Sequence, residues 1–128
     1  MANILLLETD RQIARNIQQL FKNSGHQLSY YADPQQAVAA ADKSRPDIIL
    51  LDTFLAGRSG IEFLYELRSY PDWQDIPVII TGFLPPDYMQ DFPAALQQLK
   101  VAAYVPKRDS DFKNLVVQAE KVLRAPVI

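Results

Sequence analysis

The chain has 128 residues, of which 48% are hydrophobic and 22% charged, with a formal net charge of −2 and no cysteine. These values are typical of one ordinary globular domain; they exclude disulfides and thiolate metal sites and argue against a nucleic-acid surface, which is usually basic. No apolar run approaches transmembrane length and no leader pattern precedes Asn3, so we expect a cytoplasmic domain without a membrane span.

The N-terminal part of the sequence predicts a strand, a helix and a second strand. Residues 4–7 are apolar without a break, as in a strand buried on both faces, and helical spacing begins at residue 11 after the candidate cap Asp10. The more amphipathic residues 27–31 predict a strand at the edge of the sheet. His26 precedes it in a polar stretch where we expect it to be solvated, so the chain lacks the histidines that a triad or histidine metal centre needs.

The middle of the chain carries its clearest strand. A helix is expected after Asp33, which can cap it, and Ile-Ile-Leu-Leu at 48–51 then reads as a strand buried on both faces. Asp52 follows that strand directly. It is too far from the next helical pattern, expected over 59–70, to cap it, and Ser59 is the better cap. Asp52 therefore needs another role.

The C-terminal part is less regular. The sequence indicates, in order, a strand over 77–80, an irregular segment over 82–100 with a short helix around 93–99, a strand over 101–105 and a last helix over about 109–123. Three prolines interrupt the irregular segment, which predicts a long loop there. Its apolar residues indicate either an exposed docking loop or a loop packed on its own side chains.

Strand and helix thus alternate five times in a single domain, 1–128, with a core over about 3–123 and a short tail at 124–128. Such alternation predicts an α/β domain: a doubly wound, five-stranded parallel sheet with helices on both faces. Its site is expected outside the carboxyl ends of the strands. Four polar residues follow four of the strands there: Glu8, Asp52, Thr81 and Lys107.

Two carboxylates, a hydroxyl and an amine suit phosphoryl transfer to a carboxylate. Mg²⁺ commonly takes one or two protein carboxylates together with phosphate oxygens, and an aspartate can itself be phosphorylated. A hydroxyl and a lysine would hold the phosphoryl oxygens by charge and position. Taken singly, Thr81 reads as a strand-end residue and Lys107 as a surface lysine; it is the set of four that indicates a site.

The chain resembles the receiver domain of two-component response regulators over essentially its whole length. The resemblance lies in the acid after the first strand, Asp-Ile-Ile-Leu-Leu-Asp with Gly60 eight residues on, Ile-Ile-Thr, and Tyr-Val-Pro-Lys. It implies the flavodoxin-like strand order 2-1-3-4-5 and a signalling module rather than an enzyme. At most, such a module catalyses phosphoryl transfer to its own aspartate and hydrolysis from it.

The resemblance also implies residue roles. Asp52 would be the phosphoacceptor, Thr81 and Lys107 would bind the phosphoryl group, and Glu8, Asp52 and the Phe54 backbone carbonyl would bind Mg²⁺. Tyr104 would match the family's aromatic switch residue, although a half-buried strand tyrosine accounts for it equally well. The implied partners are a histidine kinase or phosphotransfer protein and a downstream protein or second copy at the surface of the fourth helix, fifth strand and last helix.

Four departures from the family pattern bear on these roles. Thr9 stands where the family usually has a second, metal-binding acid, which should weaken Mg²⁺ binding without abolishing it. Arg108 and Ala56 stand where proline is common, and the stretch from Thr81 to Lys107 is longer than usual.

Three functions are therefore compared. A phosphorylatable receiver is favoured by Asp52, Thr81 and Lys107, whereas a pseudo-receiver that binds proteins without being phosphorylated is favoured by Thr9. A flavin-binding electron carrier of similar fold is set aside, because Glu8-Thr9-Asp10-Arg11 lacks the glycine and hydroxyl residues of a phosphate loop.

Overall fold

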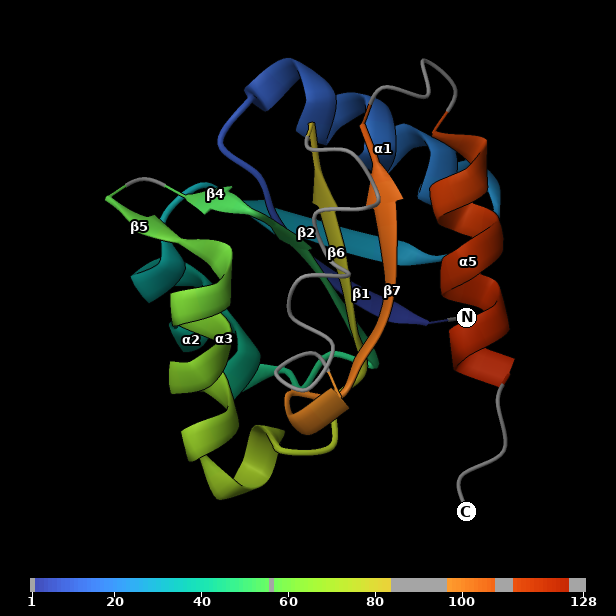
Figure 1. Ribbon diagram of the computed structural model, residues 1–128. Helices are drawn as coiled ribbons and strands as arrows, with labels where there is room; N and C mark the ends of the chain where they lie inside the picture. The colour runs from blue at the N-terminus through green and yellow to red at the C-terminus, as the bar shows by residue number, and fades with distance from the viewer. Residues whose placement is uncertain (1, 56, 84–96, 108–111, 125–128) are drawn as a thin grey trace.

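The computed structural model describes residues 2–55, 57–83, 97–107 and 112–124. In this part of the chain five parallel strands form one sheet in the order β2-β1-β3-β6-β7, with helices on both of its faces (Figure 1). The strands are β1 Asn3–Leu7, β2 Gln27–Tyr31, β3 Ile48–Asp52, β6 Val78–Gly82 and β7 Val101–Pro106. The helices are α1 Arg11–Asn23, α2 Pro34–Lys43, α3 Gly60–Ser69 and α5 Lys113–Arg124, with a 3-10 turn, η1, at Pro71–Trp73.

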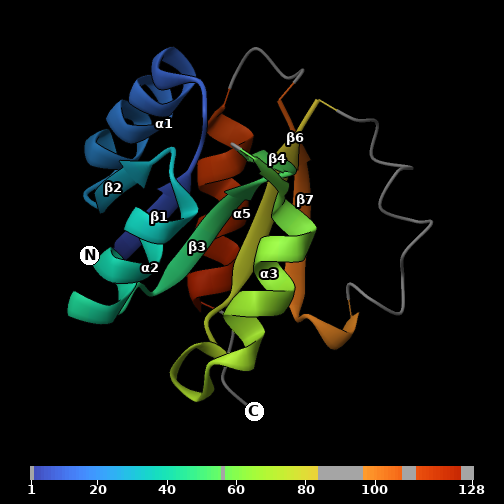
Figure 2. The same ribbon diagram turned by 90° about the vertical axis from the view of Figure 1, so that its left-hand side faces the viewer.

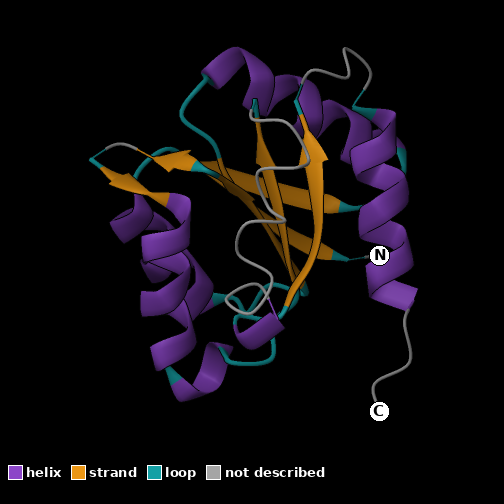
Figure 3. Ribbon diagram, viewed as in Figure 1, coloured by secondary structure: helices purple, strands orange, loops and turns teal. Residues whose placement is uncertain are grey.

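The core is split into two layers by the sheet, which explains the unbroken apolar runs. On one face α2 and α3 pack against alternate strand residues, and on the other α1 and α5 pack against the residues between them (Figures 2 and 3). In β3, for example, Ile49 and Leu51 belong to the first layer and Ile48 and Leu50 to the second. A strand buried on both faces has no position left for a polar residue until it ends.

Side-chain caps fix where three helices begin, as the sequence predicts for each. Asp10 accepts hydrogen bonds from the amides of the first turn of α1, Asp33 does so for α2, and Ser59 for α3. These caps satisfy amides that have no partner within the helix. The connections after β1, β2 and β3 are therefore held in place at the end of the sheet where the polar residues gather.

The structure adds a short antiparallel pair after β3 that the sequence did not indicate. Strands β4 Phe54–Leu55 and β5 Arg58–Ser59 form it, and Gly57 in the turn has φ +79°, a conformation that favours glycine. Gly60 then passes close to β3, because a Cβ atom there would lie 2.1 Å from the backbone oxygen of Asp52. The first residue of α3 therefore packs directly against the Asp52 backbone.

The predicted fold class and strand order are confirmed, with β6 and β7 as the fourth and fifth strands of the parallel sheet. The short helix expected at 93–99 and the loop before it lie mostly outside the described residues, as does most of the tail. Within the described residues, no helix has the length and apolarity required to cross a membrane.

We predict that Gly60→Ala lowers the free energy of unfolding by more than about 2 kcal/mol, because the new Cβ must displace the Asp52 backbone. Gly25→Ala is the matched control: its φ is +85°, yet nothing lies within 4 Å of the added Cβ. We expect about 1 kcal/mol there, from backbone strain alone. Urea denaturation measures both. A loss at Gly60 no larger than that at Gly25 would contradict the close approach.

Candidate functional site

The four polar residues predicted to meet at the edge of the sheet do so. Glu8 follows β1, Asp52 ends β3, and Lys107 follows β7, while Thr81 in β6 is in register with Asp52. Each is almost fully buried, with 6% or less of its surface exposed. The carboxyl ends of four parallel strands thus bring two acids, a hydroxyl and an amine into one enclosed cluster.

Lys107 is the centre of this cluster. Its Nζ donates hydrogen bonds to Glu8 Oε1 at 2.7 Å and to Asp52 Oδ2 at 2.7 Å, and it also contacts Glu8 Oε2. Its backbone N–H donates to the Gly82 carbonyl at 2.7 Å, and this hydrogen bond fixes the position of the Lys107 backbone relative to β6. One buried ammonium therefore bridges two carboxylates that come from different strands.

One aromatic ring, that of Phe83, lies next to the cluster. Lys107 Nζ lies 5.2 Å from the centroid of the Phe83 ring, within the range of a cation–π contact. Phe83 is itself 53% exposed, and Phe54, two residues after Asp52, is 60% exposed. The Phe54 amide also donates to Asp52 Oδ1 at 3.3 Å, so its backbone stays beside the carboxylate.

Burial sets the electrostatics of Glu8. The pKa of its carboxyl is raised from 4.5 to about 7, chiefly because burial removes it from water; the hydrogen bond from Lys107 lowers the pKa, and the charge of Asp52 raises it. Two carboxylates share one ammonium, so the ionised cluster carries an excess negative charge in a dry site. A second cation, or a proton on one carboxylate, would neutralise this excess charge.

Thr81 has an unsatisfied hydroxyl in the same place. No described residue accepts from or donates to its Oγ1, which is buried. A buried hydroxyl without a partner costs about 1–3 kcal/mol, which the structure must offset elsewhere. Its position beside Asp52 suits an anionic group carried by that carboxylate, because the hydroxyl would then gain an acceptor.

The donor set fits a hard divalent cation only in part. Glu8 and Asp52 are within the one or two carboxylates that Mg²⁺ commonly takes. Thr9, at the position of the usual second acid, is exposed and adds no charge, and no described group of three or more acidic or histidine side chains is placed to hold a metal ion. Lys107 bonds Asp52 at Oδ2 only, so Asp52 Oδ1, which accepts from the Phe54 amide at 3.3 Å, is the carboxylate oxygen that Lys107 leaves available to a cation.

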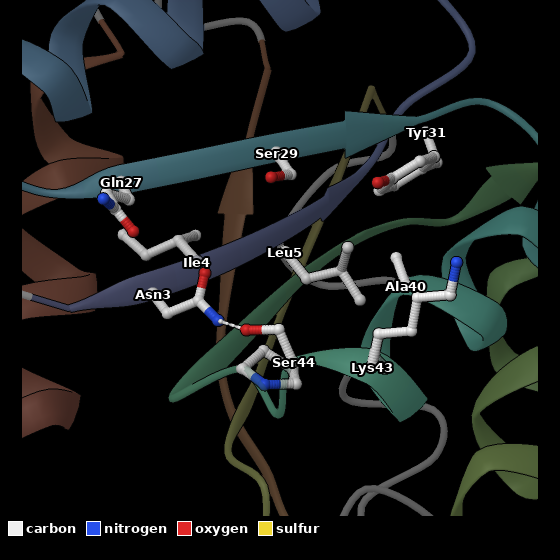
Figure 4. A pocket seen from close by; sticks show the side chains of 11 residues that line it. Asn3, Ile4, Leu5, Gln27, Ser29, Tyr31, Ala40, Lys43 and Ser44 are labelled. Carbon is white, nitrogen blue, oxygen red and sulfur yellow. Dashed lines mark hydrogen bonds between the residues drawn. The ribbon is translucent and has the colours of Figure 1, made fainter.

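The structure corrects the expectation for His26 and adds a groove away from the site. His26 has only 12% of its side chain exposed, and its Nδ1 accepts a hydrogen bond from the Ala2 amide, so it is a packed residue rather than a solvated one. A groove of about 320 Å³ lies between β1, β2 and α2, where Asn3 Nδ2 donates to Ser44 Oγ (Figure 4). It contains none of the four site residues.

Sequence reasoning missed two residues next to the cluster. Thr53 is buried directly after Asp52, and Gly82 is buried directly after Thr81, with the Tyr104 hydroxyl close to it. Tyr104 itself is half-buried, as expected for a strand tyrosine. The sequence offered one signal for Thr53 and Gly82, namely a small residue at the end of a predicted strand. A single residue of this kind gives no periodic pattern, so it was not recognised.

We predict that this domain loses stability as pH rises from about 4.5 to about 7 in a chelating buffer. Folded Glu8 binds its proton more tightly than unfolded Glu8, so its contribution is complete below pH 4.5 and is lost through pH 7. The upper limit is about 3 kcal/mol. Urea denaturation at each pH measures it, with Glu8→Gln as control. If the variant shows the same pH slope as the natural chain, Glu8 is not the group that titrates.

Sequence comparison identifies the family of this chain. The family model for the response regulator receiver domain matches residues 4–118. Response regulator Rcp1 of Synechocystis sp. is 32% identical over 113 residues, covering 81% of this chain and 75% of that protein. Protein RcaC of Microchaete diplosiphon is 32% identical over 81 residues, 63% of this chain. KdpE of Escherichia coli, a transcriptional regulatory protein, is 31% identical over 80 residues, 62% of this chain. This chain spans 12% of RcaC and 34% of KdpE.

Solved structures agree. Chemotaxis protein CheY4 of Vibrio cholerae superposes with a TM-score of 0.82 at 20% identity, covering 95% of this chain and 98% of that one. The Mn(2+)-bound form of Rcp1 gives 0.75 at 28% identity, covering 100% and 99%. With the family model matching most of its length, this chain belongs to the family of response regulator receiver domains.

Proposed function

We propose that Asp52 accepts a phosphoryl group and that the resulting rearrangement changes a protein-binding surface. One observation carries this proposal: a buried ammonium, Lys107 Nζ, lies 2.7 Å from Asp52 Oδ2, and Thr81, whose buried hydroxyl has no described partner, is the register neighbour of Asp52. A phosphoryl group on Asp52 would give this hydroxyl an acceptor and Lys107 a second anionic partner. A buried lysine serving stability alone would not require an unsatisfied hydroxyl as its neighbour.

The proposed transfer follows from these contacts. A carboxylate oxygen of Asp52 attacks the phosphorus of a phosphohistidine on a partner protein, so that an O–P bond forms as the N–P bond breaks. The electron pair of the broken bond stays on the imidazole nitrogen, which takes a proton. Lys107 then balances charge on the transferred oxygens, and Thr81 donates its hydroxyl hydrogen bond to one of them. Catalysis of this transfer depends mostly on the positions and charges of these side chains.

Magnesium fits the proposal as a bound cation. Glu8 and Asp52 would hold it, together with the Phe54 carbonyl, and when bound it supplies charge neutralisation to the phosphoryl oxygens. The cluster's excess negative charge supports such binding. Thr9 weakens it, because this position adds no carboxylate, and Lys107 competes with the cation for the oxygens of Glu8.

The proposed output surface comprises β7, α5 and the segment before β7. Val117 on α5 is 46% exposed, which suits a protein contact. β7 is an edge strand of the sheet and pairs with β6, so a shift at Thr81 reaches it through the register pair with Val105. A downstream protein or a second copy of the chain would bind here.

A second function is favoured by a specific observation. Lys107 engages both oxygens of Glu8 as well as Asp52 Oδ2, and Thr9 supplies no further acid, so the resting cluster is already closed by its own hydrogen bonds. A pseudo-receiver, which binds a protein partner without being phosphorylated, needs no more than that. The two functions differ in whether Asp52 can be modified.

We predict that acetyl phosphate with Mg²⁺ adds one phosphoryl group to the intact chain, and that Asp52→Asn abolishes the addition. Intact-protein mass spectrometry measures it directly. Thr81→Ala should slow the addition by about ten- to a hundredfold, since one donor to the phosphoryl oxygens is lost. Omission of Mg²⁺ should also remove most of the product.

Thr9→Asp provides the matched gain-of-function arm. It restores a second acid beside Glu8 and should lower the Mg²⁺ concentration that gives half-maximal phosphorylation by about tenfold. The absence of an adduct in both the natural chain and Thr9→Asp, at millimolar Mg²⁺, would contradict the phosphoacceptor role and leave the pseudo-receiver as the function.

A further inference from the structure

Arg68, near the end of α3, is bonded to three backbone carbonyls that come from two separate stretches of the chain. Its Nε donates to the Leu99 carbonyl at 2.8 Å, and its Nη1 donates to the Trp73 carbonyl at 2.7 Å. Its Nη2 donates more weakly to the Lys100 carbonyl, at 3.4 Å. The guanidinium is planar and presents its donors in a fixed fork, so it restrains the directions of these bonds as well as their lengths. We call Arg68 and these three carbonyls the Arg68 clamp.

The Arg68 clamp holds the residues that lead into β7. The chain is helical at 97–98 and then turns through Leu99 and Lys100 into β7, which starts at Val101. Lys100 has φ +57°, a left-handed conformation that is unfavourable for any residue with a side chain. The Leu99 side chain is buried in the same layer of the core as Trp73. The turn is therefore strained, and it is held by packing together with the clamp.

The other contacts of this turn do not replace the clamp. Lys100 Nζ donates to Asp75 Oδ1 at 2.7 Å, but both of these side chains are more than half exposed, and such pairs contribute little to stability. Packing against the core would be served equally by an unbranched apolar side chain in place of Arg68. The guanidinium adds directional bonds, which fix the position of the turn relative to α3 and η1.

A bulge separates the clamped end of β7 from the rest of the strand. Val78 of β6 pairs with Val101, but the next residue, Ile79, pairs with Ala103, so Ala102 has no register partner in β6. Beyond this point the pairing is regular up to the site at the other end of the strand (Figure 1). A bulge interrupts the hydrogen-bond ladder and bends the strand locally. β7 therefore has one end tied to the clamp and a longer part tied to β6 beside the site.

We propose that Arg68 is a positioning residue for the switch: it fixes the amino end of β7 to α3 and η1, and the bulge at Ala102 lets the rest of the strand move. The proposal rests on the proposed function for the origin of that movement, but the clamp itself exists in the unmodified chain. Its consequence is that phosphorylation bends β7 about a fixed end. The change at the output surface is then largest near the site and ends at the bulge.

Amide hydrogen exchange in the metal-free chain tests the clamp. Arg68→Met keeps an unbranched side chain but removes every donor. Exchange of the Lys100 amide, which donates to the Gln97 carbonyl at 3.2 Å, should then accelerate by about tenfold or more. The Thr53 amide, which donates to the Thr81 carbonyl at 2.9 Å, reports on the sheet and should accelerate less. An unchanged rate at Lys100, or an equal or greater acceleration at Thr53, overturns the clamp.

A matched control and a conservative variant isolate the role of Arg68. Arg58→Met removes an arginine that bonds Glu66 of the same helix at 3.0 Å, and it should leave the exchange of Lys100 unchanged. Arg68→Lys keeps one charged donor and should give an intermediate rate. Equal effects of Arg58→Met and Arg68→Met overturn the specific role of Arg68. In the natural chain, which needs no variant to fold, a fast-exchanging Arg68 Nε–H overturns the clamp as well.

Beryllium fluoride with Mg²⁺, added as a phosphoryl mimic, tests the fixed end. In the natural chain the amide shifts should be large from Ala103 to Val105 and small at Val101. In Arg68→Met, and to a lesser degree in Arg68→Lys, they should extend to Val101. Shifts at Val101 as large as those at Val105 in the natural chain, or the same pattern in all three chains, overturn the positioning role. A natural chain without any shift overturns the proposed function and the bending with it, while the clamp is judged by hydrogen exchange alone.

Discussion

A single buried ammonium organises the working end of this domain. Lys107 Nζ is the cation between Glu8 and Asp52, and its hydrogen bonds join the ends of β7, β1 and β3. Burying three charged groups is costly, and the cost is recovered only when the geometry is good and every partner is present. While these hydrogen bonds are intact, the cluster holds three strand ends together. A new anion or cation at the site would compete directly with them.

The sheet fixes the positions of the residues in this cluster. Both faces of β1 and β3 are covered by helices, so those strands have no freedom to slip in register without exposing a full layer of apolar residues. The polar residues appear only where that constraint ends, at the carboxyl ends. The close approach of Gly60 fixes the backbone at Asp52. The hydrogen bond from the Lys107 amide to the Gly82 carbonyl fixes the backbone at Lys107.

Much of this could be predicted from the sequence, for a physical reason. Unbroken apolar runs such as 48–51 identify strands buried on two faces, and the residue after each run must lie at the sheet edge, which is how Glu8, Asp52, Thr81 and Lys107 could be grouped. The helix caps were equally readable, because Asp10 and Ser59 are side chains with a specific bonding role.

What could not be predicted depends on side-chain contacts between distant elements. The sequence does not reveal that Lys107 bonds Glu8 in preference to solvent, nor that His26 is packed against Ala2. The β4–β5 pair is too short to give a periodic pattern. Thr53 and Gly82 gave no periodic signal, because what distinguishes them is the close approach of Thr53 and the Tyr104 hydroxyl to Gly82, which exists only once β3, β6 and β7 are aligned.

The most direct test of the central claim is ¹⁵N NMR of the Lys107 side-chain ammonium in the metal-free chain, followed through addition of Mg²⁺ and beryllium fluoride. A bridged, buried ammonium should give a signal protected from solvent exchange at rest, absent from a Lys107→Arg control used for assignment. That signal should shift in step with the Thr81 amide as the mimic binds. If the resting chain gave only fast-exchanging lysine signals, Lys107 would be solvated, and neither the closed cluster nor the switch derived from it would hold.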